Sequence, residues 1–179
     1  KEQIEKEISE ITPISDEKMG ELFKTFENIA KNSHSAKEWI AAEAEISKKT
    51  QPFISKEERL AMLKERYGSG QARWNSKLRI VATSIEDIER QVFDENSNVD
   101  ILVALQASGA LQGVWPSVEI NGKHFFDGGS FSMENPDVVV DADKMLVLST
   151  GLPVDVPYKL EDLLAQLEKN CLLYTSPSP

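Results

Sequence analysis

The sequence predicts an α/β domain, and three patterns along its 179 residues support this fold class. The first seventy residues carry apolar side chains at the spacing of amphipathic helices. From Leu78 onward, short runs of branched apolar residues, typical of strands buried in a sheet, alternate with further helical patterns. Asn121 and Gly122 join two such runs, as expected of a tight β-hairpin. Strands interleaved with helices indicate the α/β class.

Three helices are expected in the first seventy residues. Ser15 is the predicted N-cap of the first helix. Apolar residues after it follow the i, i+3, i+4, i+7 spacing of one buried face, at Met19, Leu22, Phe23, Phe26, Ile29 and Ala30. Residues 35–38 and 55–58 each have the pattern Ser-x-x-Glu, so a capping box is expected to begin the second and the third helix. The charges between the apolar positions are interpreted as solvated faces.

The later elements follow from short patterns. Strands are predicted in "LRIVAT", residues 78–83, and in "RQVFD", residues 90–94. A helix is predicted over residues 99–108, with Ser97 or Asn98 as its N-cap and Asp100 in its first turn. Two strands meet in a type I′ turn at Asn121-Gly122, and residues 144–149 form another buried strand. The final amphipathic helix is marked by Leu160, Leu163, Leu164 and Leu167.

Composition excludes several kinds of function. The formal net charge is -10, whereas nucleic-acid binding needs a basic surface, so no nucleic-acid partner is expected. No apolar run approaches the roughly 18 residues that a transmembrane helix needs. His34 and His124 are the only histidines and Cys171 is the only cysteine, so neither a zinc-site pattern nor an intrachain disulfide is expected. No metal or organic cofactor is implied.

Residues 171–179, "CLLYTSPSP", do not fit the rest of the chain, because they carry no charge and end in a Ser-Pro repeat. We interpret them as a foreign tail, translated from vector, adapter or wrong-frame sequence, with a disordered native C-terminus as the alternative. Residues 1–170 are then expected to belong to one domain. It has a helical region at residues 1–72 and a region of strands and helices at residues 73–170.

Asp127 stands at the end of an apolar strand run and directly before Gly128 and Gly129. This Asp-Gly-Gly is either a surface turn or a place where a carboxylate takes part in chemistry. Glycine can adopt positive φ and leaves space around the backbone, so the turn can bring the carboxylate close to a partner. An aspartate has a reference pKa of about 3.9, so it becomes a useful base only where burial raises that value.

Three segments in one order carry a family resemblance: residues 104–129, with Asp-Gly-Gly at their end, residues 132–137 ("SMENPD") and residues 141–149 ("DADKMLVLS"). Together they resemble the C-terminal half of a patatin-like phospholipase domain. The resemblance covers residues 73–151 most clearly. It implies a three-layer α/β/α fold with a largely parallel sheet, a variant of the α/β-hydrolase theme, truncated here at the N-terminus.

The resemblance also implies a serine lipid acyl hydrolase with a Ser-Asp dyad, in which Asp127 is the catalytic aspartate and Gly128 and Gly129 form its supporting turn. The family's serine lies in a Gly-x-Ser-x-Gly elbow, and a glycine-rich loop forms its oxyanion hole. This chain contains no Gly-x-Ser-x-Gly, and the nearest segment is "GGSFS" at residues 128–132. We therefore expect the elbow to precede Lys1 and the chain to be a fragment that is inactive alone.

The implied partner is an acyl lipid or phospholipid substrate, and the expected location is the cytoplasm, with peripheral membrane contact left open. One alternative is a catalytically inactive patatin-like protein that binds lipid or a partner. Another is an unrelated α/β interaction domain in which Asp-Gly-Gly is only a turn.

His124 precedes Asp127 by three residues in a predicted strand, and an odd offset puts side chains on opposite faces. No catalytic role is therefore expected for His124.

Overall fold

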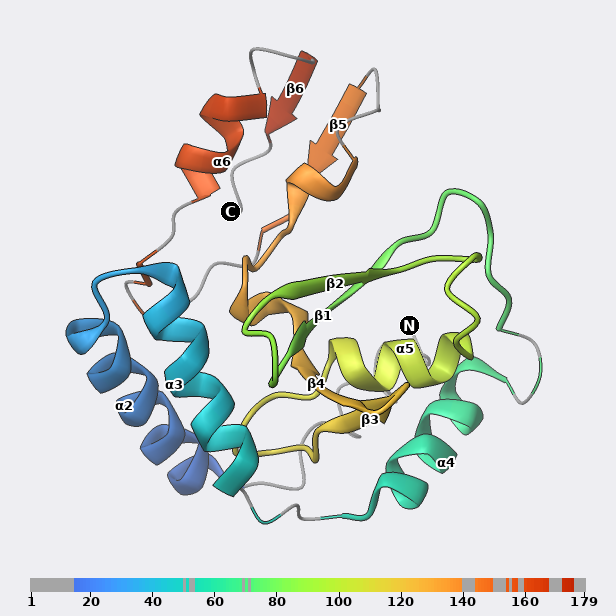
Figure 1. Ribbon diagram of the computed structural model, residues 1–179, viewed down its shortest axis with the longest axis horizontal. Helices are drawn as coiled ribbons and strands as arrows, with labels where there is room; N and C mark the ends of the chain where they lie inside the picture. Colours follow the sequence, from blue (N-terminus) through green and yellow to red (C-terminus); the bar gives the residue numbers. More distant parts are fainter. Residues whose placement is uncertain are drawn as a thin grey trace.

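The computed structural model describes residues 15–49, 51, 54–68, 70, 72–139, 144–149, 154, 156–157, 160–167 and 172–175. Its helices are α2 (Asp16–Asn32), α3 (Ala36–Lys49), α4 (Lys56–Tyr67), α5 (Ile101–Ser108) and α6 (Leu160–Leu167). Figure 1 shows α2 and α3 side by side on one flank, with α5 and α4 near the central strands. The mixture of helices and strands confirms the predicted α/β class.

The central sheet has four strands in the order β2-β1-β4-β3, and every neighbouring pair is antiparallel. These strands are β1 (Ile80–Ser84), β2 (Arg90–Phe93), β3 (Val118–Ile120) and β4 (Lys123–Asp127). The expectation of a largely parallel sheet was therefore wrong for these strands. Residues 85–89 join β1 to β2, and two residues join β3 to β4; a parallel pair would need a crossover of a dozen residues or so.

The β3–β4 hairpin turns as the sequence predicted. Asn121 has a φ of 52° and Gly122 a φ of 79°, which is the pair of positive values that a type I′ turn requires. Glycine and asparagine reach this region at low cost, so the two residues fix the register of the hairpin. That register pairs Val118 with Phe125 and brings Asp127 to the end of β4.

The helix caps were predicted in part. Ser15 caps α2, and Ser55 with Glu58 forms a complete capping box at α4. At α3, Ser35 accepts from the backbone N–H of Glu38, but the Glu38 carboxylate accepts from the N–H of His34 at 2.8 Å. The motif at residues 35–38 is therefore only half a capping box.

The N-cap predicted for α5 was wrong. Asp100, not Ser97 or Asn98, caps this helix, and its Oδ1 accepts from the N–H groups of Leu102 and Val103. The hydroxyl of Ser97 instead donates to Asp94 at 2.9 Å, within the preceding turn. Asn98 has a φ of 53°, which differs from the extended backbone of an N-cap.

Two clusters of buried side chains pack around the sheet. One joins the sheet to α5, through residues such as Ala82, Ala104 and Phe125. The other joins it to α2 and α3, through residues such as Trp39 and Phe126. Phe125 and Phe126 are neighbours on β4 and so point to opposite faces, which is why the two groups of helices contact different faces. The full three-layer fold stays a prediction.

The chain after β4 runs through a loop into the 3₁₀ helix η2 (Pro136–Val139). Asn135 directly precedes this helix, but its φ is 47° and its amide Nδ2 donates to the carbonyl groups of Gly128 and Ser132. Asn135 therefore closes the preceding loop rather than the helix.

A second, two-stranded sheet pairs β5 (Lys144–Val147) in parallel with β6 (Leu172–Thr175). The strand expected at residues 144–149 is confirmed, but Leu146 is 63% exposed, so this strand is buried on one side only. Residues 171–179 were left out of the expected fold, whereas the structure pairs Leu172–Thr175 with β5. Residues 1–14, residues 141–143 of the third resembling segment, Cys171 and residues 176–179 lie outside the described part of the chain.

Candidate active site

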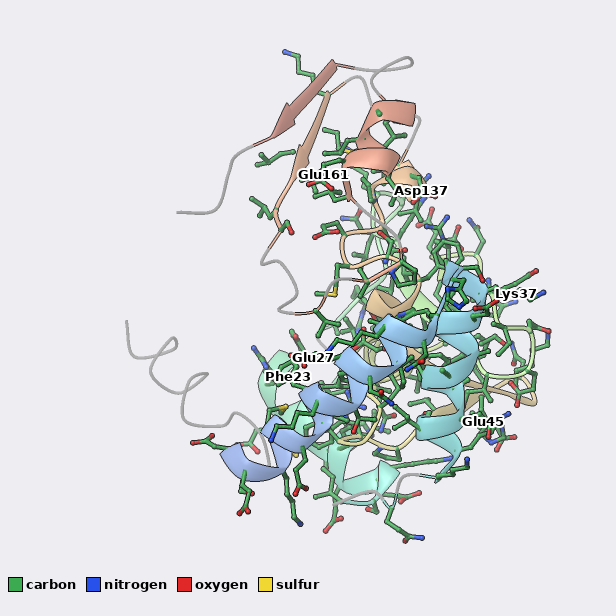
Figure 2. All side chains as sticks on the ribbon, turned by 90° about the vertical axis from the view of Figure 1, so that its left-hand side faces the viewer. Phe23, Glu27, Lys37, Glu45, Asp137 and Glu161 are labelled. Atoms are coloured by element: carbon green, nitrogen blue, oxygen red, sulfur yellow. The ribbon has the colours of Figure 1, made fainter. Side chains whose placement is uncertain are left out.

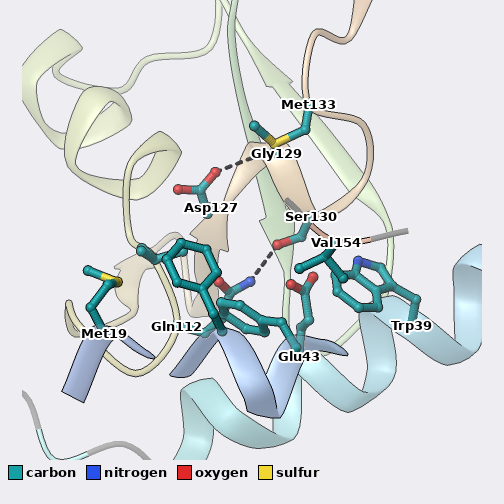
Figure 3. Close-up of a pocket in the computed structure, with 12 residues that line it drawn as sticks. Met19, Trp39, Glu43, Gln112, Asp127, Gly129, Ser130, Met133 and Val154 are labelled. Atoms are coloured by element: carbon teal, nitrogen blue, oxygen red, sulfur yellow. Dashed lines mark hydrogen bonds between the residues drawn. The ribbon is translucent and has the colours of Figure 1, made fainter. Parts of the chain in front are cut away.

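Asp127 lines a cavity of about 250 Å³ (Figure 3). Helices α2 and α3, the segment after α5 and the turn after β4 supply its walls. Six of the lining side chains are apolar: Met19, Phe23, Phe26, Leu111, Met133 and Val154. Among the described residues that line it, none is a lysine, an arginine or a histidine. An apolar cavity with a few convergent polar groups is the usual form of a small-molecule site.

The backbone of Asp127 is held from two sides. Its N–H donates to the carbonyl oxygen of Ala110 at 3.2 Å, and its own carbonyl oxygen accepts from the Thr83 hydroxyl at 2.9 Å. On the side chain, Oδ1 accepts from the N–H of Gly129 at 2.8 Å, and no donor from the described residues reaches Oδ2. One carboxylate oxygen is therefore fixed in place while the other remains free to act on a ligand.

Gly128 and Gly129 support this turn by the space they leave. Neither uses the positive φ that glycine can adopt, because neither is among the glycines with positive φ. A Cβ on Gly128 would lie 2.3 Å from the carbonyl oxygen of Val81 in β1. A Cβ on Gly129 would lie 3.0 Å from Oδ1 of Asp127 and 3.2 Å from the sulfur of Met133. Gly128 therefore allows the turn to lie against the sheet, and Gly129 keeps the carboxylate uncrowded.

Burial of Asp127 raises the pKa of its carboxyl group above the usual range. The hydrogen bond from the Gly129 N–H and the positive charge of Arg59 act in the opposite direction and lower this pKa. The net result is a carboxylate that binds a proton more readily than an exposed aspartate does. A general base needs this property, since its pKa must approach the working pH.

Glu43 of α3 is a second carboxyl group in the cavity, and sequence reasoning missed it. Its side chain is only 4% exposed, and its Oε2 has no hydrogen-bond partner among the described residues. Burial raises the pKa of Glu43 to about 8, and the negative charge of Asp127 adds to the rise, while Ser130 and Trp39 oppose it. Glu43 is therefore mostly an uncharged carboxylic acid at neutral pH, and it shares the cavity with a second carboxyl group, Asp127, whose pKa burial also raises.

A sequence signal for Glu43 was present. Glu43 follows Trp39 by four residues and Ile40 by three, so it lies on the apolar side of α3. Interpreting every charge on these helices as part of a solvated face was wrong for Glu43 and for Arg59. It was right for others, and Figure 2 shows Glu27, Lys37 and Glu45 on the outward side of α2 and α3.

Arg59 of α4 is buried close to the site but does not line the cavity. Its guanidinium group donates to the carbonyl oxygen of Gly109 and lies 4.6 Å from the ring centre of Trp115. Burial lowers the pKa of Arg59 to about 10, so the group stays charged at neutral pH. It therefore places a positive charge at the C-terminal end of α5, where the helix dipole favours one, and draws the pKa of Asp127 downward.

His124 points away from the cavity, as its odd offset from Asp127 predicted. Its Nδ1 lies 2.9 Å from Oε1 of Glu86, and both residues line a different cavity.

No group of three or more histidine, cysteine, aspartate or glutamate residues that could hold a metal ion is found in the described part of the chain. Nor is any helix of that part both long enough and apolar enough to cross a membrane.

Comparison with known families identifies the protein family of this chain. Residues 14–140 match the family model for patatin-like phospholipases. The chain belongs to the patatin-like phospholipase family. The match begins at the start of α2, so the helical region also belongs to this family domain, beyond the segment where the resemblance was clearest. A comparison with curated proteins found no match.

Members of this family generally hydrolyse lipid esters, so the chain is related to lipid hydrolases. The matched segment includes Asp127, Glu43 and almost all of the cavity lining. Membership also rules out the alternative of an unrelated interaction domain.

Replacing Gly128 with alanine is expected to destabilise the protein by at least about 2 kcal/mol, because the new methyl group would overlap the Val81 carbonyl oxygen. Urea unfolding of the chain measures the change. Gly20→Ala is the matched control, since Gly20 lies inside α2 with open space around it and alanine there should add about 0.5–1 kcal/mol. Equal unfolding midpoints for Gly128→Ala and the unmodified protein would contradict the close contact.

Replacing Glu43 with glutamine is expected to stabilise the protein, increasingly as the pH rises. Because its pKa is 4.5 when exposed and about 8 when folded, the folded protein keeps a proton that the unfolded chain releases. Stability is therefore lost as the pH rises between those values, by roughly 5 kcal/mol, and the loss is complete above the folded pKa. Glutamine cannot ionise, so its advantage should grow over this range, as measured by urea unfolding at several pH values.

Glu45→Gln on the same helix is the control for that experiment. Glu45 is exposed, and its hydrogen bond with Lys48 lowers the pKa of its carboxyl group. A lowered pKa means that the ionised Glu45 stabilises the folded protein at pH values above the ordinary glutamate range. The Glu45→Gln variant should therefore become less stable than the unmodified protein as the pH rises through that range. A Glu43→Gln variant with the pH dependence of the unmodified protein would show that Glu43 ionises normally.

Proposed function

We propose that the protein is a lipid acyl hydrolase in which Asp127 is the base of a Ser-Asp dyad. The observation that carries this proposal is the geometry of one carboxylate. Asp127 ends β4 at the wall of an apolar cavity, with Oδ1 held by Gly129 and Oδ2 without a donor among the described residues. The raised pKa of Asp127 supports the same role, since a stronger base removes a hydroxyl proton more readily.

The reaction proceeds through an acyl-enzyme. Asp127 accepts the proton of a serine hydroxyl as the serine oxygen attacks the ester carbonyl carbon, and the alcohol leaves with a proton. Water then attacks the acyl-enzyme, again with Asp127 as base, and releases the fatty acid. Electrostatic stabilisation of the tetrahedral oxyanion is the main catalytic contribution. The mechanism uses no metal or organic cofactor.

The nucleophile belongs to a Gly-x-Ser-x-Gly elbow that this sequence does not contain, and we place it upstream of Lys1. Ser130 is the nearest serine to Asp127 in the chain, but its Oγ accepts from Nε2 of Gln112 inside the protein. It also lies on the 3₁₀ turn η1 (Gly128–Ser130) rather than at a strand-to-helix elbow. The chain alone therefore supplies the base and the cavity without the nucleophile and is inactive by itself.

The substrate is an acyl lipid or a phospholipid whose acyl part enters the cavity, since the six apolar side chains favour hydrocarbon. We place the protein in the cytoplasm with peripheral contact to a membrane. The net charge of -10 offers no attraction to anionic lipid surfaces, so apolar contact would bring the site to its substrate.

A second candidate function is binding of acyl lipid or of a protein partner without catalysis. The missing Gly-x-Ser-x-Gly favours it, because a protein whose native sequence never contained that elbow would keep the cavity but lack the nucleophile. The native coding sequence upstream of Lys1 separates the two functions. An elbow there supports the hydrolase, and an open frame without one supports the binding protein.

Asp127→Asn is expected to lower kcat for ester hydrolysis by roughly 10²–10⁴-fold, because asparagine cannot accept the serine proton. The assay uses the protein expressed from its complete native coding sequence, with a chromogenic short-chain ester and a phospholipid as substrates. Asp87→Asn is the control, since Asp87 is an exposed turn residue bound to Lys123. Unchanged hydrolysis by a folded Asp127→Asn protein would remove Asp127 from the mechanism.

A further inference from the structure

The walls of the Asp127 cavity suit a small hydrocarbon group. Its volume is about 250 Å³, and six apolar side chains line it together with Asp127, Ser130 and one polar end. Because a cavity of about 150 Å³ accommodates benzene, this one has room for roughly ten non-hydrogen atoms. The cavity therefore fits a short acyl group or one segment of a longer chain.

The polar end of the cavity consists of Trp39, Glu43 and Gln112. These side chains are 2%, 4% and 1% exposed, and all three line the cavity. Figure 3 shows the Glu43 carboxyl group between Trp39 and Gln112, facing Ser130. Nε1 of Trp39, Oε2 of Glu43 and Oε1 of Gln112 each lack a hydrogen-bond partner among the described residues. Buried polar atoms are nearly always hydrogen-bonded, so three of them around one cavity indicate a group that the cavity takes up.

The three atoms define the chemistry of that group. Nε1 of Trp39 can only donate a hydrogen bond, and Oε1 of Gln112 can only accept one. Glu43, mostly protonated because burial raises its pKa to about 8, can do both. A hydroxyl group donates and accepts at once, and so satisfies this set, whereas a ketone or an ether offers no proton to Gln112. A phosphate or a carboxylate would enter beside Asp127 with no cation in the described lining.

We propose that the cavity selects an acyl group carrying a hydroxyl substituent, and that Trp39, Glu43 and Gln112 bind that hydroxyl. This subsite rests on the proposed function, because the acyl group is the part of the substrate that such a hydrolase holds next to its base. It adds a specificity determinant at the polar end of the cavity. An ordered water molecule is the competing occupant, since water also donates and accepts.

Binding to the 179-residue chain tests the subsite without any turnover. The probes are methyl 6-hydroxyhexanoate and methyl hexanoate, which differ only in the terminal hydroxyl group. Nitrogen-15 labelling makes the indole N–H of Trp39 a direct reporter, and a Trp39→Phe sample assigns its signal apart from those of Trp74 and Trp115. The hydroxy ester is expected to bind at least about fivefold more tightly, the effect of one net hydrogen bond, and to shift the Trp39 signal.

Two variants decide the role of Glu43. Glu43→Leu keeps the volume but removes the hydrogen-bonding group, so the two esters should bind with dissociation constants within about twofold of each other. Glu43→Gln keeps a donor and an acceptor at the same place, so it should retain the preference for the hydroxy ester. The indole signals of Trp74 and Trp115 show whether each variant is folded.

Three results would overturn the subsite: failure of both esters to bind, equal binding by the unmodified chain, and an undiminished preference in Glu43→Leu. Equal dissociation constants for the two esters would also indicate that a water molecule, not a substrate hydroxyl, occupies the polar end. None of these results depends on catalysis, so they leave the assay of Asp127→Asn as the separate test of the hydrolase. If the chain binds the hydroxy ester more tightly and Asp127→Asn is still fully active, the subsite stands and the Ser-Asp dyad is excluded.

Discussion

The region around Asp127 depends on the close approach of Gly128 to Val81, where a Cβ would lie only 2.3 Å from the Val81 carbonyl oxygen. It lets the chain turn directly beneath β1 at the end of β4, while the pairing of Ala82 with Asp127 keeps the strand in register up to that turn. The loop beyond the turn is tied to the same place, since the amide of Asn135 donates to the carbonyl oxygen of Gly128. The position of the carboxylate is therefore a property of the sheet rather than of a loose surface loop.

A second set of contacts secures this loop to the far strand of the sheet. Arg90 of β2 donates to both carboxylate oxygens of Asp137 at 2.7 Å, and its guanidinium group lies 4.5 Å from the ring centre of Phe131. Such a two-point contact fixes orientation as well as distance. The loop that presents Ser130 and Met133 to the cavity is therefore bound at Gly128 through Asn135 and at Asp137 through Arg90.

Local sequence signals predicted the local structure. Apolar spacing, Ser15, Ser55 and the Asn121-Gly122 turn each act within a few residues, and α2, α4 and the hairpin follow from them. The strand direction could also have been predicted, because residues 85–89 are too few for a parallel crossover. The position of Asp127 at a strand end was anticipated in the same way, while its catalytic role stays a prediction.

The surroundings of Asp127 could not be predicted locally, since they come from helices far away in the chain. Glu43 shows the limit most clearly: its place on the apolar side of α3 was visible, but not that this side closes over Asp127. The cost of burying a carboxyl group appears only when the tertiary contacts are known.

The pairing of β1 with β4 has a consequence for how the protein folds. The hydroxyl of Thr83 bonds to the backbone of Asp127 across 44 positions of the chain, with β2, α5 and β3 between them. Closing so long a loop is slow compared with forming a helix or a hairpin, because its entropy is lost before the contacts compensate. The helices and the β3–β4 hairpin can therefore form early, during synthesis as well, whereas the cavity forms after them, once β4 has paired with β1. A chain that is still bound to the ribosome therefore offers no cavity to a ligand until β4 has joined the sheet.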